Sequence, residues 1–277
     1  MNMFNDLSTA SATDGGTGTK ASIASGFGGA SQTYDSASRL QKAMGDTLLS
    51  RIPESFRPES VLDLGCGTGW FTRKLTARFP EARVTGADLS PGMLAQAEAA
   101  TDRADVNWLN ADAEQLPLAD QSVDLVFSNL MVQWSQQPEA VLAECQRVLR
   151  PGGLLVMSTL VDGTLRELKQ AWAKADPGQP HVNRFVPAEQ WRSLTKTTLA
   201  GSALELAPVR LRYDSPMMLN RELKQLGAVF KGEERRRTVT APGRFRAMCR
   251  AYPGARSGQV FATYEAGWLS WQKPKAG

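Results

Sequence analysis

The stretch VLDLGCGTGW at residues 61–70 decides the fold, because an apolar, strand-like run ends there in three alternating glycines. Glycine has no Cβ atom, so the backbone at Gly65, Gly67 and Gly69 can take positive φ angles and lie close to a ligand. The spacing G-x-G-x-G after Asp63 differs from the G-x-G-x-x-G of dinucleotide-binding turns, and the Gly-Lys-Ser/Thr ending of a P-loop is absent. The stretch therefore predicts a ligand-binding turn of another kind between a strand and a helix.

Strand-like and helix-like segments alternate from about residue 60 to residue 160. In the helix-like segments apolar residues recur at helical spacing, as at Val141, Cys145 and Val148. This alternation predicts an α/β fold with a central, mostly parallel sheet and helices on both of its faces. The strand-like segments are residues 60–65, 82–90, 106–112, 122–129 and 153–160.

Two acidic residues follow strand-like segments. Asp88 ends the second of them, about 20 residues after the glycines, where a carboxylate can accept hydrogen bonds from both hydroxyls of a ribose. Asp112 follows the third and can accept from the exocyclic amine of an adenine. Together with the glycine spacing, these acids predict a ligand that contains an adenosine but no pyrophosphate.

The composition excludes several classes of protein. The chain has 277 residues, of which 42% are hydrophobic, and that is ample for a buried core. No apolar run reaches the roughly 18–20 residues that span a bilayer, so we expect no membrane segment. Cys66, Cys145 and Cys249 lie far apart and the chain has one histidine, so we expect neither a metal site nor a disulfide framework. A cytoplasmic protein is the simplest interpretation.

The segments VLDLGCGTG, GADLS, NADAEQLPLADQSVDLVFSN and RVLRPGGLLVMST resemble the class I S-adenosylmethionine-dependent methyltransferases over residues 55–160. The resemblance implies a Rossmann-like fold and S-adenosyl-L-methionine as cofactor. It places the methionine part of the cofactor by the acid and glycines of the first turn, the ribose after the second strand, the adenine after the third and the methyl group after the fourth. The implied cofactor-binding residues are Asp63, Gly65, Gly67, Gly69, Asp88, Leu89, Asp112, Ala113, Asn129 and Leu130.

A longer resemblance covers residues 26–272. The segments GFGGASQTYDSASRLQ, SNLMVQW, TLVDGTLRELKQAW, HVNRFVP, LNRELKQLGA and TYEAGWLSW are together similar to the malonyl-[acyl-carrier-protein] O-methyltransferases of biotin synthesis. That family transfers a methyl group to the free carboxylate of a malonyl thioester. We accordingly expect a disordered tail at 1–22 and a single domain at 23–277. Within that domain we expect a cofactor-binding core at 55–160, and helical insertions that cover the substrate, with a late strand, at 161–257.

The implied reaction needs no general base, because a carboxylate is already ionised at neutral pH. One cation would hold the acceptor carboxylate, and Arg184 in HVNRF is the candidate. Asn183 and Tyr34 are the candidates for neutral, orienting donors, and these three form the predicted catalytic set. Gln133 and Trp134, after the fourth strand, are predicted to line the acceptor pocket.

The last quarter of the chain is basic, with 14 Lys and Arg against 6 Asp and Glu over residues 201–277. The run Arg235, Arg236 and Arg237, and the i,i+4 pair Arg246 and Arg250, are therefore expected to contact an acidic carrier protein. The expected substrate is malonyl-acyl carrier protein, or else malonyl-coenzyme A. We expect a monomer that does not bind nucleic acid, since aromatic residues are not interleaved with the arginine run.

Three other functions stay open on the sequence. The first is methylation of another small-molecule carboxylate or of a quinone precursor, because the core motifs do not name the acceptor. The second is a non-catalytic regulatory protein that binds S-adenosylmethionine. The third is an RNA methyltransferase, which would bind RNA with a steep dependence on salt.

Overall fold

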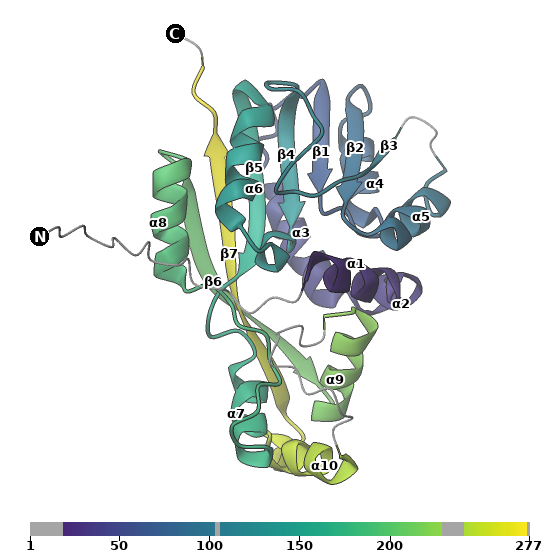
Figure 1. Cartoon of the computed structure of the whole chain (residues 1–277), viewed down its shortest axis with the longest axis vertical. Coiled ribbons are helices and arrows are strands. Elements are labelled where there is room, and N and C mark those ends of the chain that lie inside the picture. Colours follow the sequence, from purple (N-terminus) through teal and green to yellow (C-terminus); the bar gives the residue numbers. More distant parts are fainter. Residues whose placement is uncertain (1–18, 103–105, 229–240, 276–277) are drawn as a thin grey trace, which may run out of the picture.

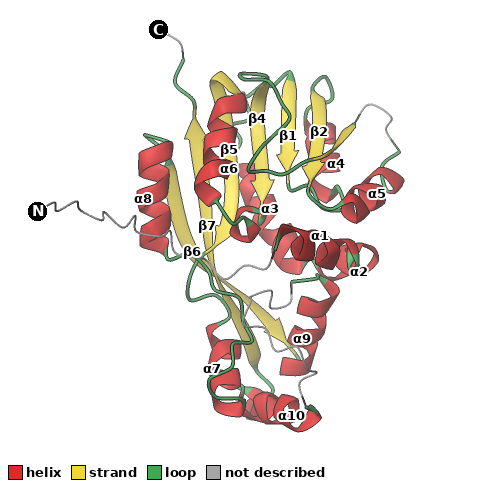
Figure 2. Ribbon diagram, viewed as in Figure 1, coloured by secondary structure: helices red, strands yellow, loops and turns green. Residues whose placement is uncertain are grey.

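The computed structural model describes residues 19–102, 106–228 and 241–275. In these ranges the chain forms one seven-stranded sheet in the order β3-β2-β1-β4-β5-β7-β6 (Figures 1 and 2). The first five strands of that order are parallel, and β7 runs antiparallel between β5 and β6. The mostly parallel sheet is thus confirmed. The strands are β1 (Ser60–Leu64), β2 (Arg83–Asp88), β3 (Asn107–Asn110), β4 (Val123–Asn129), β5 (Leu149–Leu160), β6 (Ala203–Tyr213) and β7 (Val260–Gln272).

Helices pack on both faces of the sheet, because successive strand residues point to opposite sides. Leu125 and Phe127 of β4 join the core beneath α3 and α4, whereas Val126 joins the core beneath α6 and α8. The helices are α1 (Lys20–Gly28), α2 (Ser31–Ala37), α3 (Arg39–Ser50), α4 (Trp70–Arg78), α5 (Pro91–Ala99), α6 (Pro138–Val148), α7 (Arg166–Ala175), α8 (Ala188–Thr198), α9 (Pro216–Gln225) and α10 (Pro242–Ala251), with short 3₁₀ helices η1 (Val132–Trp134) and η2 (Ala255–Ser257). None of the helices in the described ranges is long and apolar enough to cross a membrane.

The last two strands extend beyond the rest of the sheet. All of β6 pairs with β7, whereas β5 pairs only with the Ala266–Gln272 part of β7. The extension carries α7, α9 and α10 as a lower lobe beneath the parallel strands (Figure 1). The range 161–257, predicted to hold substrate-covering helices and a late strand, contains α7, α8, α9 and α10 together with β6, and β7 begins at Val260.

The first helix begins inside the segment expected to be a disordered tail. Helix α1 starts at Lys20, and the side chain of Thr19 caps it by accepting from the backbone N–H of Ser22. The boundary expected at residue 22 therefore falls within a helix. The Thr19 cap is a local start signal, and an ion pair of Lys20 with Asp112 in the loop after β3 joins this end of the helix to the sheet.

Candidate functional site

The glycine turn joins β1 to α4 at the carboxyl end of the parallel strands. Gly65 has φ +78° and Gly69 has φ +73°, so both lie in the left-handed region that other residues rarely adopt. A Cβ atom on Gly65 would lie 2.3 Å from the side chain of Met131, whereas one on Gly67 would meet nothing within 4 Å. The turn therefore needs glycine for its shape and leaves an open space in front of Gly67.

Two carboxylates flank this turn. Oδ2 of Asp88 accepts from the backbone N–H of Gly67 at 2.9 Å, and Oδ1 accepts from that of Ser90 at 2.8 Å. Burial raises the pKa of Asp88, although these hydrogen bonds oppose the shift. Asp63 is buried on β1 and accepts from the hydroxyl of Thr72 at 2.6 Å. Burial, followed by the nearby charge of Asp88, raises the pKa of Asp63 to about 7.

A cavity of about 100 Å³ runs from the turn to the loop after β3, and we call it the cofactor cavity. One face of α1 covers it, with Ile23, Ala24 and Phe27 at helical spacing. Most of the residues predicted to bind the cofactor meet here, whereas Asp63 and Gly69 do not line the cavity. Those that line it are Gly65, Gly67, Asp88, Leu89, Asp112, Ala113, Asn129 and Leu130.

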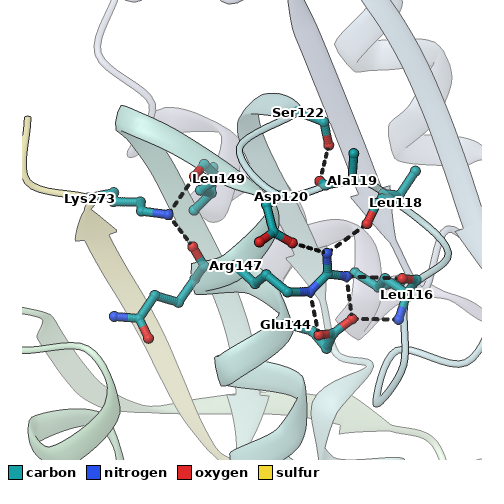
Figure 3. A network of polar contacts seen from close by, with 10 residues as sticks. Leu116, Leu118, Ala119, Asp120, Ser122, Glu144, Arg147, Leu149 and Lys273 are labelled. Carbon is teal, nitrogen blue, oxygen red and sulfur yellow. Dashed lines mark hydrogen bonds and ion pairs between the residues drawn. The ribbon is translucent and has the colours of Figure 1, made fainter. Parts of the chain in front are cut away.

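Arg147 of α6 positions the loop that carries Asp112 (Figure 3). Its guanidinium donates to both carboxylate oxygens of Glu144 at 2.7 Å and to Asp120 at 2.8 Å. It also donates to the backbone carbonyls of Leu116 at 3.0 Å and Leu118 at 2.7 Å. The hydrogen bonds from Arg147 hold the pKa of Glu144 below its ordinary value. The planar guanidinium of Arg147, with several N–H donors, thus joins the loop to α6.

A second cavity, of about 440 Å³, lies between the sheet and the lower lobe, and we call it the acceptor cavity. Its wall is largely apolar, with Leu160, Leu168 and Trp172 among its members. Glu222 also lines it, but this carboxylate already accepts from Arg39 at 2.8 Å. Among the described residues that line the cavity there is no lysine or arginine.

The two cavities meet at an aromatic junction formed by Phe27, Tyr34, Leu130 and Trp134, which line both. The rings of Phe27 and Trp134 lie edge to face, with centroids 5.1 Å apart. Leu130 has φ +54°, a strained value for a side-chain-bearing residue, and its backbone N–H donates to Ser158 Oγ at 3.0 Å. Burial, followed by the charge of Asp88, raises the pKa of Tyr34, so its hydroxyl stays protonated and can donate.

The structure separates the residues predicted to handle the acceptor. Tyr34, Gln133, Trp134 and Asn183 line the acceptor cavity. Arg184 is exposed and lines neither cavity.

The basic residues of the last quarter lie on the lower lobe or outside the described residues. Arg246 and Arg250 are exposed on α10. The run 235–237 falls outside the ranges that the structure describes.

Several residues that line the two cavities carry no functional pattern of their own in the sequence, among them Lys20, Phe27 and Gln41. Phe27 and Gln41 belong to the segment 26–41 that carries the longer resemblance, and this is the signal that could have identified them. The residues present fit an adenosine linked to a charged chain. Asp88 suits a ribose, the space before Gly67 admits close contact, and Asp63 suits a cationic group.

Comparisons with known proteins agree with this geometry. A family model described as "Methyltransferase domain" matches residues 62–157. The malonyl-[acyl-carrier protein] O-methyltransferase of Hahella chejuensis is 44% identical over 250 residues, which cover 90% of this chain and 88% of the relative. The YcgJ protein of Bacillus subtilis superposes with a TM-score of 0.59 at 17% identity, over 85% of this chain and 99% of that one. A Haemonchus contortus phosphoethanolamine N-methyltransferase in complex with S-adenosyl-L-methionine superposes with a TM-score of 0.56 at 20% identity, over 93% of this chain and 58% of that one. The structural matches confirm the Rossmann-like methyltransferase fold.

Proposed function

Because the chain belongs to the malonyl-[acyl-carrier protein] O-methyltransferase family, we propose that it methylates the free carboxylate of a malonyl thioester on acyl carrier protein. The cofactor in this proposal is S-adenosylmethionine, and the reaction serves an early step of biotin synthesis. The observation that carries the proposal is the aromatic junction at which the cofactor cavity opens into the acceptor cavity. A donor and an acceptor held in these two cavities would meet there.

Bound S-adenosylmethionine supplies an electrophilic methyl group on a sulfonium. The chain's own residues have to align the acceptor carboxylate with that methyl, and such alignment alone can lower a barrier greatly. Tyr34 keeps its proton and can donate from the junction, and Asn183 brings a neutral amide to the acceptor cavity. Neutral donors orient a carboxylate without withdrawing as much of its charge as a cation does. The aromatic residues at the junction exclude water from the reacting atoms.

The acceptor cavity also suits the rest of a carrier-bound thioester. Its apolar wall can take the acyl chain and its linker, while the carrier itself stays outside. Arg184 lies outside both cavities, so we propose Tyr34 and Asn183 in its place as contacts for the acceptor carboxylate, and the exposed arginines of α10 as contacts for the carrier. We also propose that the enzyme works as a monomer in the cytoplasm.

Intact-mass spectrometry tests the proposal. Malonyl-carrier protein is incubated with the enzyme and S-adenosylmethionine, with acetyl-carrier protein, malonyl-coenzyme A, quinone precursors and RNA in parallel reactions. A mass gain of one methyl on the malonyl carrier, and none on the acetyl carrier, would establish carboxyl methylation. A gain on malonyl-coenzyme A alone would reject the carrier as substrate. Cofactor binding without turnover of any acceptor would instead support a regulatory protein.

A further inference from the structure

Gln41 of α3 brings an unpaired side-chain amide to the acceptor cavity. Its Oε1 is buried without a hydrogen-bond partner among the described residues, and its Nε2 donates to none of them. Leaving a buried polar atom unpaired costs free energy, so such atoms are rare in folded proteins. The amide of Gln41 therefore indicates a ligand that pairs with it in this cavity.

A chain of hydrogen bonds places Gln41 beside the aromatic junction. The backbone N–H of Leu130 donates to Ser158 Oγ at 3.0 Å, and that hydroxyl donates to Oδ1 of Asn129 at 2.7 Å. Nδ2 of Asn129 in turn donates to the backbone carbonyl of Gln41 at 2.9 Å. Because Leu130 lines both cavities and Asn129 lines the cofactor cavity, this chain anchors α3 where the two cavities meet.

Two other amides that line the acceptor cavity are already oriented by the backbone. Nε2 of Gln133 donates to the carbonyl of Leu130 at 2.7 Å, and Nδ2 of Asn220 donates to that of Pro216 at 2.8 Å. Gln41 has no such bond, so its amide can turn its N–H donors toward a ligand. In the part of the chain that the structure describes, no lysine or arginine lines this cavity, and a carboxylate bound there depends on neutral donors.

We propose that Nε2–H of Gln41 donates to the acceptor carboxylate and, together with Tyr34, orients it for methyl transfer. This assignment rests on the proposed function. A carboxylate has only acceptor oxygens, so it pairs with the N–H end of an amide and is repelled by the oxygen end. A neutral amide also leaves the carboxylate more of its charge than a guanidinium does, and the carboxylate stays nucleophilic. Gln41 is thus a further catalytic residue.

Two substitutions of Gln41 separate the role of the N–H from that of the oxygen. Gln41→Met keeps an unbranched side chain without the amide, and we expect kcat/KM for malonyl-carrier protein to fall about 10- to 100-fold, the range of a hydrogen bond to a charged group. Gln41→Glu keeps an acceptor oxygen, loses the N–H and adds a charge that repels the acceptor, so we expect a larger fall. Gln96→Met on α5 is the matched control, because Gln96 is also half-buried but lines none of the cavities.

Calorimetry on the complex with S-adenosylhomocysteine isolates the binding of the acceptor. Gln41→Met should weaken malonyl-carrier protein about as much as it lowers kcat/KM, and its methyl ester much less, because the ester has no ionised carboxylate. Affinity for S-adenosylhomocysteine should not change, although Gln41 also lines a small cavity of about 40 Å³ beside the glycine turn. The free energy of unfolding should not fall, because the amide that is removed has no partner among the described residues.

The opposite results would overturn the assignment. Activity that is kept in Gln41→Glu and lost in Gln41→Met would show that Gln41 accepts a hydrogen bond from the acceptor. Equal weakening of the malonyl carrier and its methyl ester, or of S-adenosylhomocysteine, would place the amide on another part of the ligands. An unchanged kcat/KM in Gln41→Met would show that the amide is not used, and if that variant does not fold, Gln41→Glu decides alone. A wild-type chain that methylates no malonyl thioester rejects the proposed function itself, a result distinct from the others.

Discussion

Nζ of Lys20 lies 2.5 Å from Oδ2 of Asp112 and the same distance from Oε2 of Glu114, so one ammonium joins α1 to the loop after β3. Partial burial alone would raise the pKa of Glu114, but the hydrogen bonds it accepts, that from Lys20 foremost, lower it instead. A second link is the hydroxyl of Ser90, which donates to the backbone carbonyl of Ala24 at 2.9 Å. Helix α1 is therefore fastened over the cofactor cavity at the end formed by the loop after β3, where we propose that the adenine binds.

We expect Lys20→Met to speed dissociation of the cofactor. Loss of a partly exposed ion pair costs about 0.2–1 kcal/mol, so the dissociation rate should rise up to about 5-fold. Stopped-flow displacement of S-adenosylhomocysteine measures this rate. Lys20→Arg keeps the charge and should behave much as the wild type. Slower dissociation from the Met variant would instead mean that Lys20 competes with the adenine for Asp112.

The same contact illustrates what the sequence could and could not predict. The glycine turn, Asp88 and the loop of Asp112 were predictable, because each lies next to the strand that positions it. Lys20 was placed in a tail, since its partner lies 92 residues further along the chain. The lower lobe was predicted as helices with a late strand, but not the antiparallel pairing of β6 with β7 that carries it, because this pairing joins residues far apart in the sequence, from Tyr213 with Val260 to Ala203 with Ser270. The sequence placed Trp70 next to the turn, but it could not show that its buried Nε1 has no hydrogen-bond partner among the described residues, because that depends on packing.

We expect the stability of the ligand-free protein to fall as the pH rises from about 4 to 7. The folded state keeps the proton of Asp63 up to a pKa of about 7, whereas the unfolded state loses it near the ordinary value of 3.8. The folded state thus binds more protons across this window, and its stability decreases with pH and then levels off. Thermal unfolding measured between pH 5 and 8 checks the slope.

The Asp63→Asn variant is the control for that slope. The asparagine can still accept a hydrogen bond from Thr72. The variant should reduce the dependence of stability on pH only in part, because Asp88, whose pKa is also raised, still contributes to it. A ligand ammonium favours the ionised acid, so binding of S-adenosylhomocysteine should tighten as the pH rises toward 7 in the wild type and not in the variant. An identical pH dependence in both proteins would rule out Asp63 as its source.

Replacement of Arg147 should loosen the loop after β3, which we propose holds the adenine (Figure 3). Arg147→Met leaves the carbonyls of Leu116 and Leu118 without their donor, and we expect a loss of about 1–3 kcal/mol in the free energy of unfolding. Arg147→Lys should recover little of this free energy, because an ammonium cannot present several N–H donors in one plane as a guanidinium does. Denaturant unfolding gives the free energy. S-adenosylhomocysteine and 5′-methylthioadenosine, which share the adenosine, should both bind more weakly to Arg147→Met. Weakening of only one of them would show that the loop does not hold the adenine.

Asn183 and Arg184 are neighbours in sequence but differ in position, which allows a direct comparison. Asn183 lines the acceptor cavity, so Asn183→Ala should lower kcat/KM for malonyl-carrier protein at least about 10-fold without changing the affinity for the cofactor. Arg184 is exposed outside the cavity, and we expect the smaller effect from Arg184→Ala. Steady-state kinetics measures kcat/KM for both variants and compares the two losses. A loss in Arg184→Ala as large as that in Asn183→Ala would restore the predicted cationic clamp, and an unchanged kcat/KM would remove it.

The exposed arginines of α10 should guide an acidic carrier to the acceptor cavity. Helix α10 packs against α7, and its Phe245 ring lies 6.3 Å from that of Trp172, which lines the cavity. We expect Arg246→Glu and Arg250→Glu to raise KM for malonyl-carrier protein and to weaken the rise of KM with salt, because surface charges act through a screened field. Malonyl-pantetheine, which has no carrier, should react equally well with all variants. Arg192→Glu on α8 is the control for a general change in net charge. A wild-type KM that does not change between low and moderate salt would contradict an electrostatic carrier contact at this helix.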